Sequence, residues 1–128
     1  MDIVTTSHRI LGEMILPLLI VIAAIWFTVS WKPNAPASTA ARLFPILVDL
    51  QATLGIIYFV SLIVAGDPDI LTFPLLLHPV IGLLAAGFAH MAVKGGPFRS
   101  LGRWAALAGL AVLLVMVLGN VLLVRAAA

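Results

Sequence analysis

The sequence predicts an all-α integral membrane protein built as one four-helix bundle. Of its 128 residues, 63% are hydrophobic and only 9% are charged, whereas soluble domains are about half apolar and about a quarter charged. A small soluble domain leaves a large share of its surface in water, so it could not hide this many apolar side chains. The chain also contains four apolar stretches, each near the roughly 20 residues that cross a bilayer. We therefore expect residues 1–128 to form a single transmembrane domain.

Residues that break helices separate the four predicted spans. The spans cover about residues 9–31, 43–65, 73–93 and 103–125. Proline and glycine mark the connections between them, at Lys32-Pro33-Asn34, Gly66-Asp67-Pro68 and Gly95-Gly96-Pro97. Small residues on the third and fourth spans, among them Gly82 and Gly109, are of the kind that lets membrane helices pack closely.

The distribution of Lys and Arg predicts the orientation, because cytoplasmic loops are rich in these residues. Five of them occupy the first and third connections and their edges: Lys32, Arg42, Lys94, Arg99 and Arg103. The opposite side has two, Arg9 and Arg125. We therefore expect a multi-pass protein of the cytoplasmic (inner) membrane, with both termini on the outer, periplasmic side.

Two histidines are the main candidates for a binding site, since an ionisable residue inside a membrane span is costly and marks a functional candidate. His8 opens the first span and His78 lies in the first turns of the third. These spans run in the same direction, so both side chains should lie at a similar depth near the outer surface. Two imidazoles from parallel helices of a bundle can hold a haem iron from both faces. The alternative for each histidine is a polar anchor at the membrane interface.

The third histidine belongs elsewhere. His90 lies 12 residues after His78. This separation is roughly 18 Å along a helix that rises about 1.5 Å per residue, so the two cannot bind one metal. We expect His90 near the inner interface, beside Lys94.

The remaining polar residues of the spans have simpler interpretations. Arg9 and Glu13 are four residues apart and can pair on one helix face; in the sharper alternative, Arg9 binds a haem propionate and Glu13 serves a proton or quinol. Asp49 is expected to cap its helix or pair with Arg42, with a proton relay as the alternative. Gln51 and Asn120 are expected to form hydrogen bonds inside the bundle.

Three segments resemble one half of the heme A synthase family. They are His8-Arg9-Ile10-Leu11-Gly12, Leu50-Gln51-Ala52-Thr53-Leu54-Gly55 and Leu77-His78. In each four-helix half of that family, histidines that open two parallel helices on the outer side can ligate haem, and an intervening helix carries a Gln in an LQxxLG-like pattern. The resemblance places His8 and His78 at the ligand positions and Gln51 at the position of this Gln.

The chain departs from that family in ways that bear on activity. The resemblance covers about residues 8–90, which is one half of the family's architecture. Thr5 and Thr6 stand where the family's catalytic half has a Glu shortly before its first ligand, and the outer-loop cysteines are absent. Oxidation of a haem methyl group is therefore not expected, and what the resemblance implies is either a single b-type haem site or the fold alone.

Two functions follow from these observations. In the first, the chain is a small haem b protein that transfers electrons, as a subunit of a larger membrane redox complex; His8 and His78 are metal ligands, and Arg9 and Gln51 complete the cofactor site. In the second, it is a cofactor-free accessory subunit of a respiratory or photosynthetic membrane complex, because its short loops leave no domain outside the membrane.

The expected partners are lipid and other membrane subunits, with a quinone left open as a further ligand. The few basic residues form no stripe, which argues against nucleic acid. The chain has no cysteine, which excludes thiolate-ligated haem and Cys-ligated iron–sulfur clusters. No nucleophile–base pair is visible, so we predict no catalytic residue and no enzymatic activity of the chain on its own.

Overall fold

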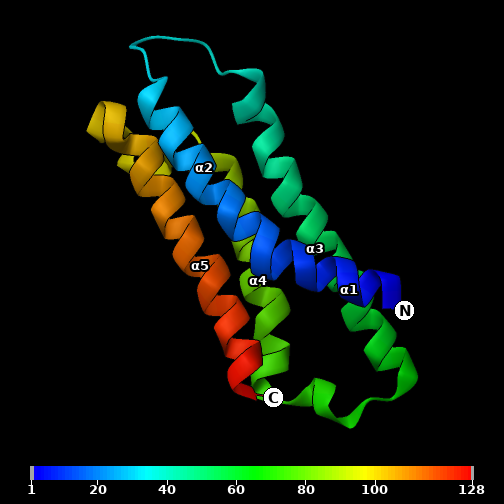
Figure 1. The fold of residues 1–128 in the computed structure, drawn as a ribbon. Helices are drawn as coiled ribbons and strands as arrows, with labels where there is room; N and C mark the ends of the chain where they lie inside the picture. Colours follow the sequence, from blue (N-terminus) through cyan, green and yellow to red (C-terminus); the bar gives the residue numbers. More distant parts are fainter. Residues whose placement is uncertain (1, 128) are drawn as a thin grey trace.

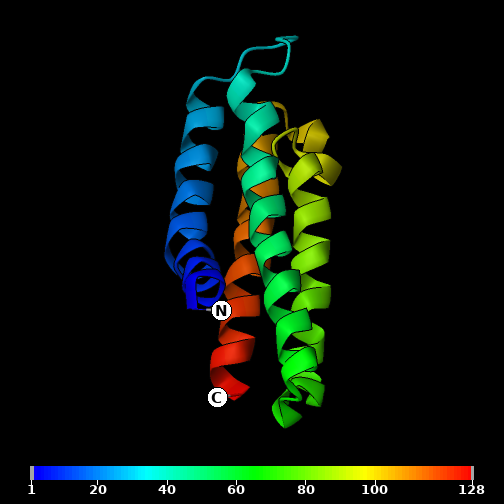
Figure 2. The ribbon, with the colours of Figure 1, turned by 90° about the vertical axis from the view of Figure 1, so that its right-hand side faces the viewer.

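The computed structural model describes residues 2–127 and is helical in all of its regular elements. In chain order these are α1 (Asp2–Ile10), the π-helical segment η1 (Leu11–Ile15), α2 (Leu16–Val29), α3 (Thr39–Ala65), the 3₁₀ segment η2 (Pro68–Leu71), α4 (Phe73–Ala92), the 3₁₀ segment η3 (Gly96–Trp104) and α5 (Ala105–Ala127). The helices run up and down along one another (Figures 1 and 2). This confirms the predicted all-α four-helix architecture.

Within residues 2–127, four helical stretches are long and apolar enough to cross a membrane, and the last of them is kinked at Gly102, whose φ of 60° and ψ of −119° are not helical. They are Ile3–Val29, Thr39–Ala65, Phe73–Ala92 and Gly96–Ala127. The second and third agree closely with prediction. The first begins several residues before the predicted start, because a polar first turn carries no hydropathy signal, and the fourth includes a 3₁₀ segment where an irregular connection was expected.

The first span is sharply bent, and Pro17 accounts for the position of the bend. Proline has no N–H for the carbonyl of the residue four before it, and its ring crowds that carbonyl. Just before Pro17 the backbone widens into η1, where the N–H of Leu16 bonds to the carbonyl of Leu11. As a result α1 turns away from the axis of α2 and crosses α3 (Figure 1). Such π-helical turns inside α-helices are frequent at functional sites.

The core lies where α2, α4 and α5 meet. Leu16 and Ile20 of α2 and Leu110 and Leu113 of α5 are fully buried. They face a row of buried alanines on α4: Ala85, Ala86, Ala89 and Ala92. A Cβ at Gly109 would stand 2.7 Å from the carbonyl oxygen of Ala92, so only a glycine allows α5 to approach α4 this closely. The predicted packing of small residues between the last two spans is therefore confirmed.

The connections end the helices as the sequence indicates. The Ser38 side chain accepts a hydrogen bond of 3.1 Å from the N–H of Ala41 and caps α3. Gly66 ends α3 with a φ of 72°, a left-handed conformation that glycine adopts without strain. The guanidinium of Arg103 lies 5.9 Å from the ring centroid of Trp31, so the first and third connections meet at one end of the bundle.

Candidate functional site

The two histidines singled out by the sequence lie side by side in the structure. The ring centroids of His8, on α1, and His78, on α4, are 6.0 Å apart, and the ring planes are 84° to one another. The bend of the first span places α1 so that His8 faces α4 across the bundle. The prediction that both histidines share one depth is confirmed.

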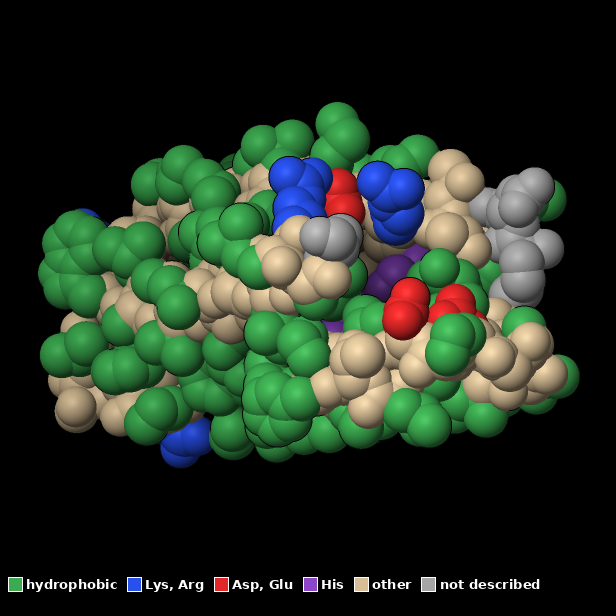
Figure 3. All heavy atoms as spheres, turned by 90° about the horizontal axis from the view of Figure 1, so that it is seen from below, with side chains coloured by type: hydrophobic (Ala, Val, Ile, Leu, Met, Phe, Trp, Pro, Cys, Tyr) green, Lys and Arg blue, Asp and Glu red, His purple; other side chains and the backbone are tan. Residues whose placement is uncertain are grey.

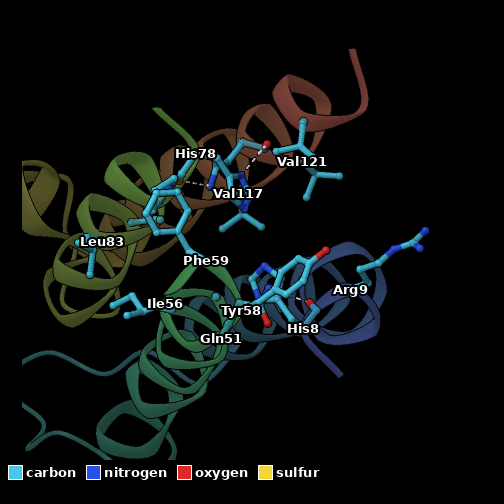
Figure 4. Close-up of a pocket in the computed structure, with 18 of the residues that line it drawn as sticks. His8, Arg9, Gln51, Ile56, Tyr58, Phe59, His78, Leu83, Val117 and Val121 are labelled. Atoms are coloured by element: carbon cyan, nitrogen blue, oxygen red, sulfur yellow. Dashed lines mark hydrogen bonds between the residues drawn. The ribbon is translucent and has the colours of Figure 1, made fainter. Parts of the chain in front are cut away.

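A cavity of about 250 Å³ surrounds the two rings. Apart from a few polar groups its walls are apolar, and they include Leu16, Ile56, Phe59, Leu83, Val117 and Val121, which come from all four spans (Figure 4). Seen from the end of the bundle nearest the C-terminus, histidine side chains are visible in a hollow between charged groups (Figure 3). An apolar pocket with a few converging polar groups is typical of a ligand site.

Residues of α3 fix the position of His8. The Gln51 side-chain amide donates a hydrogen bond of 2.9 Å to the backbone carbonyl of His8. A Cβ at Gly12 would collide with that amide, and a Cβ at Gly55 would stand 2.8 Å from Cε1 of the His8 ring. Both glycines of the family-like motifs thus make room for a specific contact. Gln51 lines the cavity, and its bond to the backbone of His8 confirms the predicted hydrogen bond inside the bundle.

Asn120 of α5 fixes the position of His78. Nδ1 of His78 lies 3.3 Å from the backbone carbonyl oxygen of Asn120, and the Asn120 side-chain amide donates a bond of 3.0 Å to the carbonyl of His78. A carbonyl only accepts, so Nδ1 carries the proton in this bond and Nε2 keeps its lone pair. Metal-ligating histidines commonly donate their second nitrogen to a carbonyl in this way.

Unpaired polar atoms gather around the same cavity. Among residues 2–127, three buried side-chain atoms lack a hydrogen-bond partner: Nδ1 of His8, Oε1 of Gln51 and Oδ1 of Asn120. All three residues line the cavity. Buried polar groups are normally hydrogen-bonded, and exceptions need a specific explanation. A ligand or ordered water in the cavity would supply the missing contacts.

Charged side chains stand at the rim of the cavity. Nη2 of Arg125 donates to Oε2 of Glu13 over 2.7 Å, and Nε of Arg9 lies 3.8 Å from Oε1 of the same carboxylate. The predicted pairing of Arg9 with Glu13 is confirmed. Sequence reasoning assigned no role to Arg125; its only signal was a basic residue in the last turn of the last helix.

Tyr58 is a further cavity residue that sequence reasoning missed. Its ring centroid lies 6.3 Å from that of His8 (Figure 4). A tyrosine on an apolar helix resembles many others that serve only packing, so nothing in the local sequence distinguishes it.

The second polar pair of the bundle lies away from this cavity. Nε2 of His90 is 2.9 and 3.1 Å from the two carboxylate oxygens of Asp49. The predicted partner of Asp49, Arg42, was therefore wrong: the packing of α3 on α4 turns Asp49 toward His90. The expectation that His90 is separate from the His78 site is confirmed, because neither His90 nor Asp49 lines the cavity.

The two histidines could hold a metal centre only where its other ligands came from a cofactor. Among the described residues, no group of three or more His, Cys, Asp or Glu side chains converges. A porphyrin supplies four nitrogens itself, so its iron needs only axial ligands from the protein. Two imidazoles bonded at about 2 Å on opposite sides of one metal have ring centroids roughly 6 Å apart, close to the 6.0 Å between His8 and His78.

Comparison with family models, with curated proteins and with solved structures gave no match to this chain. The functional argument therefore depends on the geometry of the cavity.

Proposed function

We propose that this chain is a b-type haem-binding membrane protein in which His8 and His78 would hold the haem iron. The observation that carries the proposal is the 6.0 Å between the two ring centroids, inside an apolar cavity formed by all four spans. A bound haem supplies a one-electron redox couple. With His8 and His78 both holding the iron, the chemistry we propose for the site is electron transfer.

The surrounding residues support each ligand in a distinct way. The carbonyl of Asn120 orients His78 so that Nε2 is the free nitrogen. Gln51 and Gly55 hold His8 from α3, one through the backbone and the other by leaving space for the ring. The apolar walls exclude water and lower the local dielectric, which are two of the means by which a protein sets a redox potential. The resemblance of the histidine and Gln51 motifs to heme A synthase supports the same assignment.

The proposed setting is the cytoplasmic membrane, with both termini outside. The meeting of Trp31 with Arg103 at one end of the bundle supports this orientation, because the connections there carry the excess of basic residues. The cavity then opens toward the outer surface. We propose that the protein works with other membrane subunits of a redox complex, from which it exchanges electrons.

A second candidate is a cofactor-free accessory subunit of a respiratory or photosynthetic complex. The observation in its favour is the wide separation of α2 and α3, which scarcely touch (Figure 1). The groove between them, of about 570 Å³, is lined by apolar residues that include Leu19, Trp26, Leu43 and Leu47. A neighbouring membrane helix would fill such a groove.

A reduced-minus-oxidised absorption spectrum of the purified, haem-supplied protein tests the first proposal. We expect a b-type α-band in the native chain and in His90→Ala, and its loss in His8→Ala and in His78→Ala, with helix content unchanged by circular dichroism. A well-folded native protein without haem would contradict the proposal and leave the accessory-subunit role. An α-band that survives both ligand substitutions would show that haem binds but that His8 and His78 do not hold it.

A further inference from the structure

The rim of the cavity holds two guanidinium groups for one carboxylate. Arg9 extends from α1 and Arg125 from the last turn of α5, and both reach Glu13 of η1. The two arginine side chains are 69% and 63% exposed, whereas that of Glu13 is 24% exposed. With both arginines charged and Glu13 ionised, the cluster carries one net positive charge at the entrance of an apolar cavity.

Each guanidinium has unused hydrogen-bond donors. An arginine side chain offers five N–H donors in a planar fork that matches a carboxylate. Arg125 uses one of them on Glu13, at 2.7 Å, and Arg9 approaches Glu13 only at 3.8 Å. Among residues 2–127, Glu13 is the single carboxylate within ion-pair distance of either arginine. The remaining donors are available to a ligand in the cavity, which Arg9 and Glu13 themselves line.

The charge distribution around the opening is one-sided. Figure 3 shows two basic side chains flanking an acidic one on one side of the hollow and acidic side chains alone on the other. Asp67 and Asp69 belong to the connection whose Ile70 lines the cavity. An anionic group is therefore attracted to the arginine side and repelled from the opposite side. An unpaired carboxylate is costly in an apolar cavity, so the arginine side is where the charged edge of a ligand would lie.

We propose that Arg9 and Arg125 together bind the peripheral carboxylates of the cavity ligand, and that the cavity selects an apolar molecule with an anionic edge. This inference rests on the proposed haem function and extends it, because it assigns the carboxylates of the ligand to the arginines at the rim. Glu13 competes for the same donors and limits the affinity for the anionic edge.

The test is the affinity of the full-length protein, in detergent or nanodiscs, for two probes that differ only in this edge. The probes are haem b and its dimethyl ester, which lacks the two carboxylate charges. The measured quantity is the selectivity, defined as the Kd for the ester divided by the Kd for haem b. The variants are Arg9→Gln, Arg125→Gln and Glu13→Gln, with Arg99→Gln, from the opposite end of the bundle, as the matched control.

We expect Arg125→Gln to lower the selectivity about tenfold, Arg9→Gln to lower it less, and the control to leave it unchanged. Affinity for the ester should stay the same in all four variants. Glu13→Gln, which removes the competing charge, should raise the selectivity. Because this change is a gain, it cannot come from a variant that folds poorly.

Three results would overturn the inference. If Arg125→Gln weakened both probes equally, Arg125 would act through the fold and not through the ligand charge. If the selectivity of the native protein were near one, the arginines at the rim would not bind the carboxylates of haem, although the proposed haem function would stand. If the native protein bound neither probe, the proposed function would fail and this inference with it.

Discussion

Each of the two polar clusters of this bundle contains a histidine of α4, but the two histidines differ in their surroundings and in their hydrogen-bond partners. His78 and His90 both belong to α4. His78 is half-buried against the cavity, and its nitrogen Nδ1 bonds to a backbone carbonyl. His90 is exposed on the outside of the bundle, and its nitrogen Nε2 lies between both oxygens of Asp49.

The difference lies in what each partner leaves free. The carbonyl of Asn120 takes one nitrogen of His78 and leaves Nε2 with its lone pair beside a second histidine. The carboxylate of Asp49 takes Nε2 of His90, and no other titratable side chain of the described residues is within ion-pair distance. A buried imidazole with a free nitrogen beside another imidazole can bind a metal centre, whereas an exposed one paired with a carboxylate serves as a polar contact between helices.

The largest expected effect comes from a substitution that displaces His8 from His78 without replacing either histidine. Gly55→Val would place a side chain where the His8 ring lies, since even a Cβ there would stand 2.8 Å from Cε1. The ring is the mobile partner, so we expect His8 to be displaced and haem binding to be lost while the helices persist. Difference absorption measures haem binding, and circular dichroism measures the helix content.

Gly87→Val is the matched control for this substitution. It is also a helical glycine, but a Cβ there meets nothing within 4 Å. Haem binding equal to that of the native chain is expected. Native haem binding by Gly55→Val would show that His8 is not a ligand.

The second largest expected effect is a loss of stability, at the close contact between α4 and α5. Gly109→Val would collide with the backbone of Ala92, which cannot move independently of α4. Forcing extra volume into a packed interface costs about 1–3 kcal/mol, so thermal unfolding in detergent should occur at a lower temperature. Gly119→Val, where a Cβ meets nothing within 4 Å, should leave the unfolding temperature unchanged. Equal stability of the two variants would contradict the close α4–α5 contact.

The smallest expected effect concerns the hydrogen-bond partners of the two histidines, Asn120 beside His78 and Asp49 beside His90. Asn120→Leu removes the side-chain bond to the carbonyl of His78 and loosens the segment that orients its ring. Loss of such a supporting residue lowers metal-site affinity about tenfold or more. Asp49→Asn, which disturbs the partner of His90, should change haem affinity by less than about twofold, because distant sites act independently. Haem titration of both variants measures this contrast, and equal losses would mean that the two clusters are coupled.

Part of the site was predictable because helix direction alternates along a membrane bundle. The order of the spans places His8 and His78 at one depth, and the i, i+4 spacing of Arg9 and Glu13 places them on one face. The bend at Pro17 was not predicted, although proline was visible in the sequence, because a proline within a helix can kink it by different amounts. Without that bend, the direction in which His8 points cannot be derived.

Other features depended on contacts between residues far apart in the chain. Arg125 meets Glu13, and Asp49 meets His90 in place of Arg42, because of how each helix is rotated about its axis. That rotation is decided by side-chain packing along whole helices, such as the contact of Gly109 with Ala92, and single residues do not reveal it.

The sequence by itself determined that the chain is a bundle of four helices apolar enough to cross a membrane, where the second and third of them begin and end, and which polar residues lie inside them. Apolar length and helix-breaking residues are local properties, so they can be read without the fold. The tertiary structure decided which polar atoms meet. The partner of His78 is a backbone carbonyl, a group that every residue has, and only the packing of α5 on α4 selects the one at Asn120.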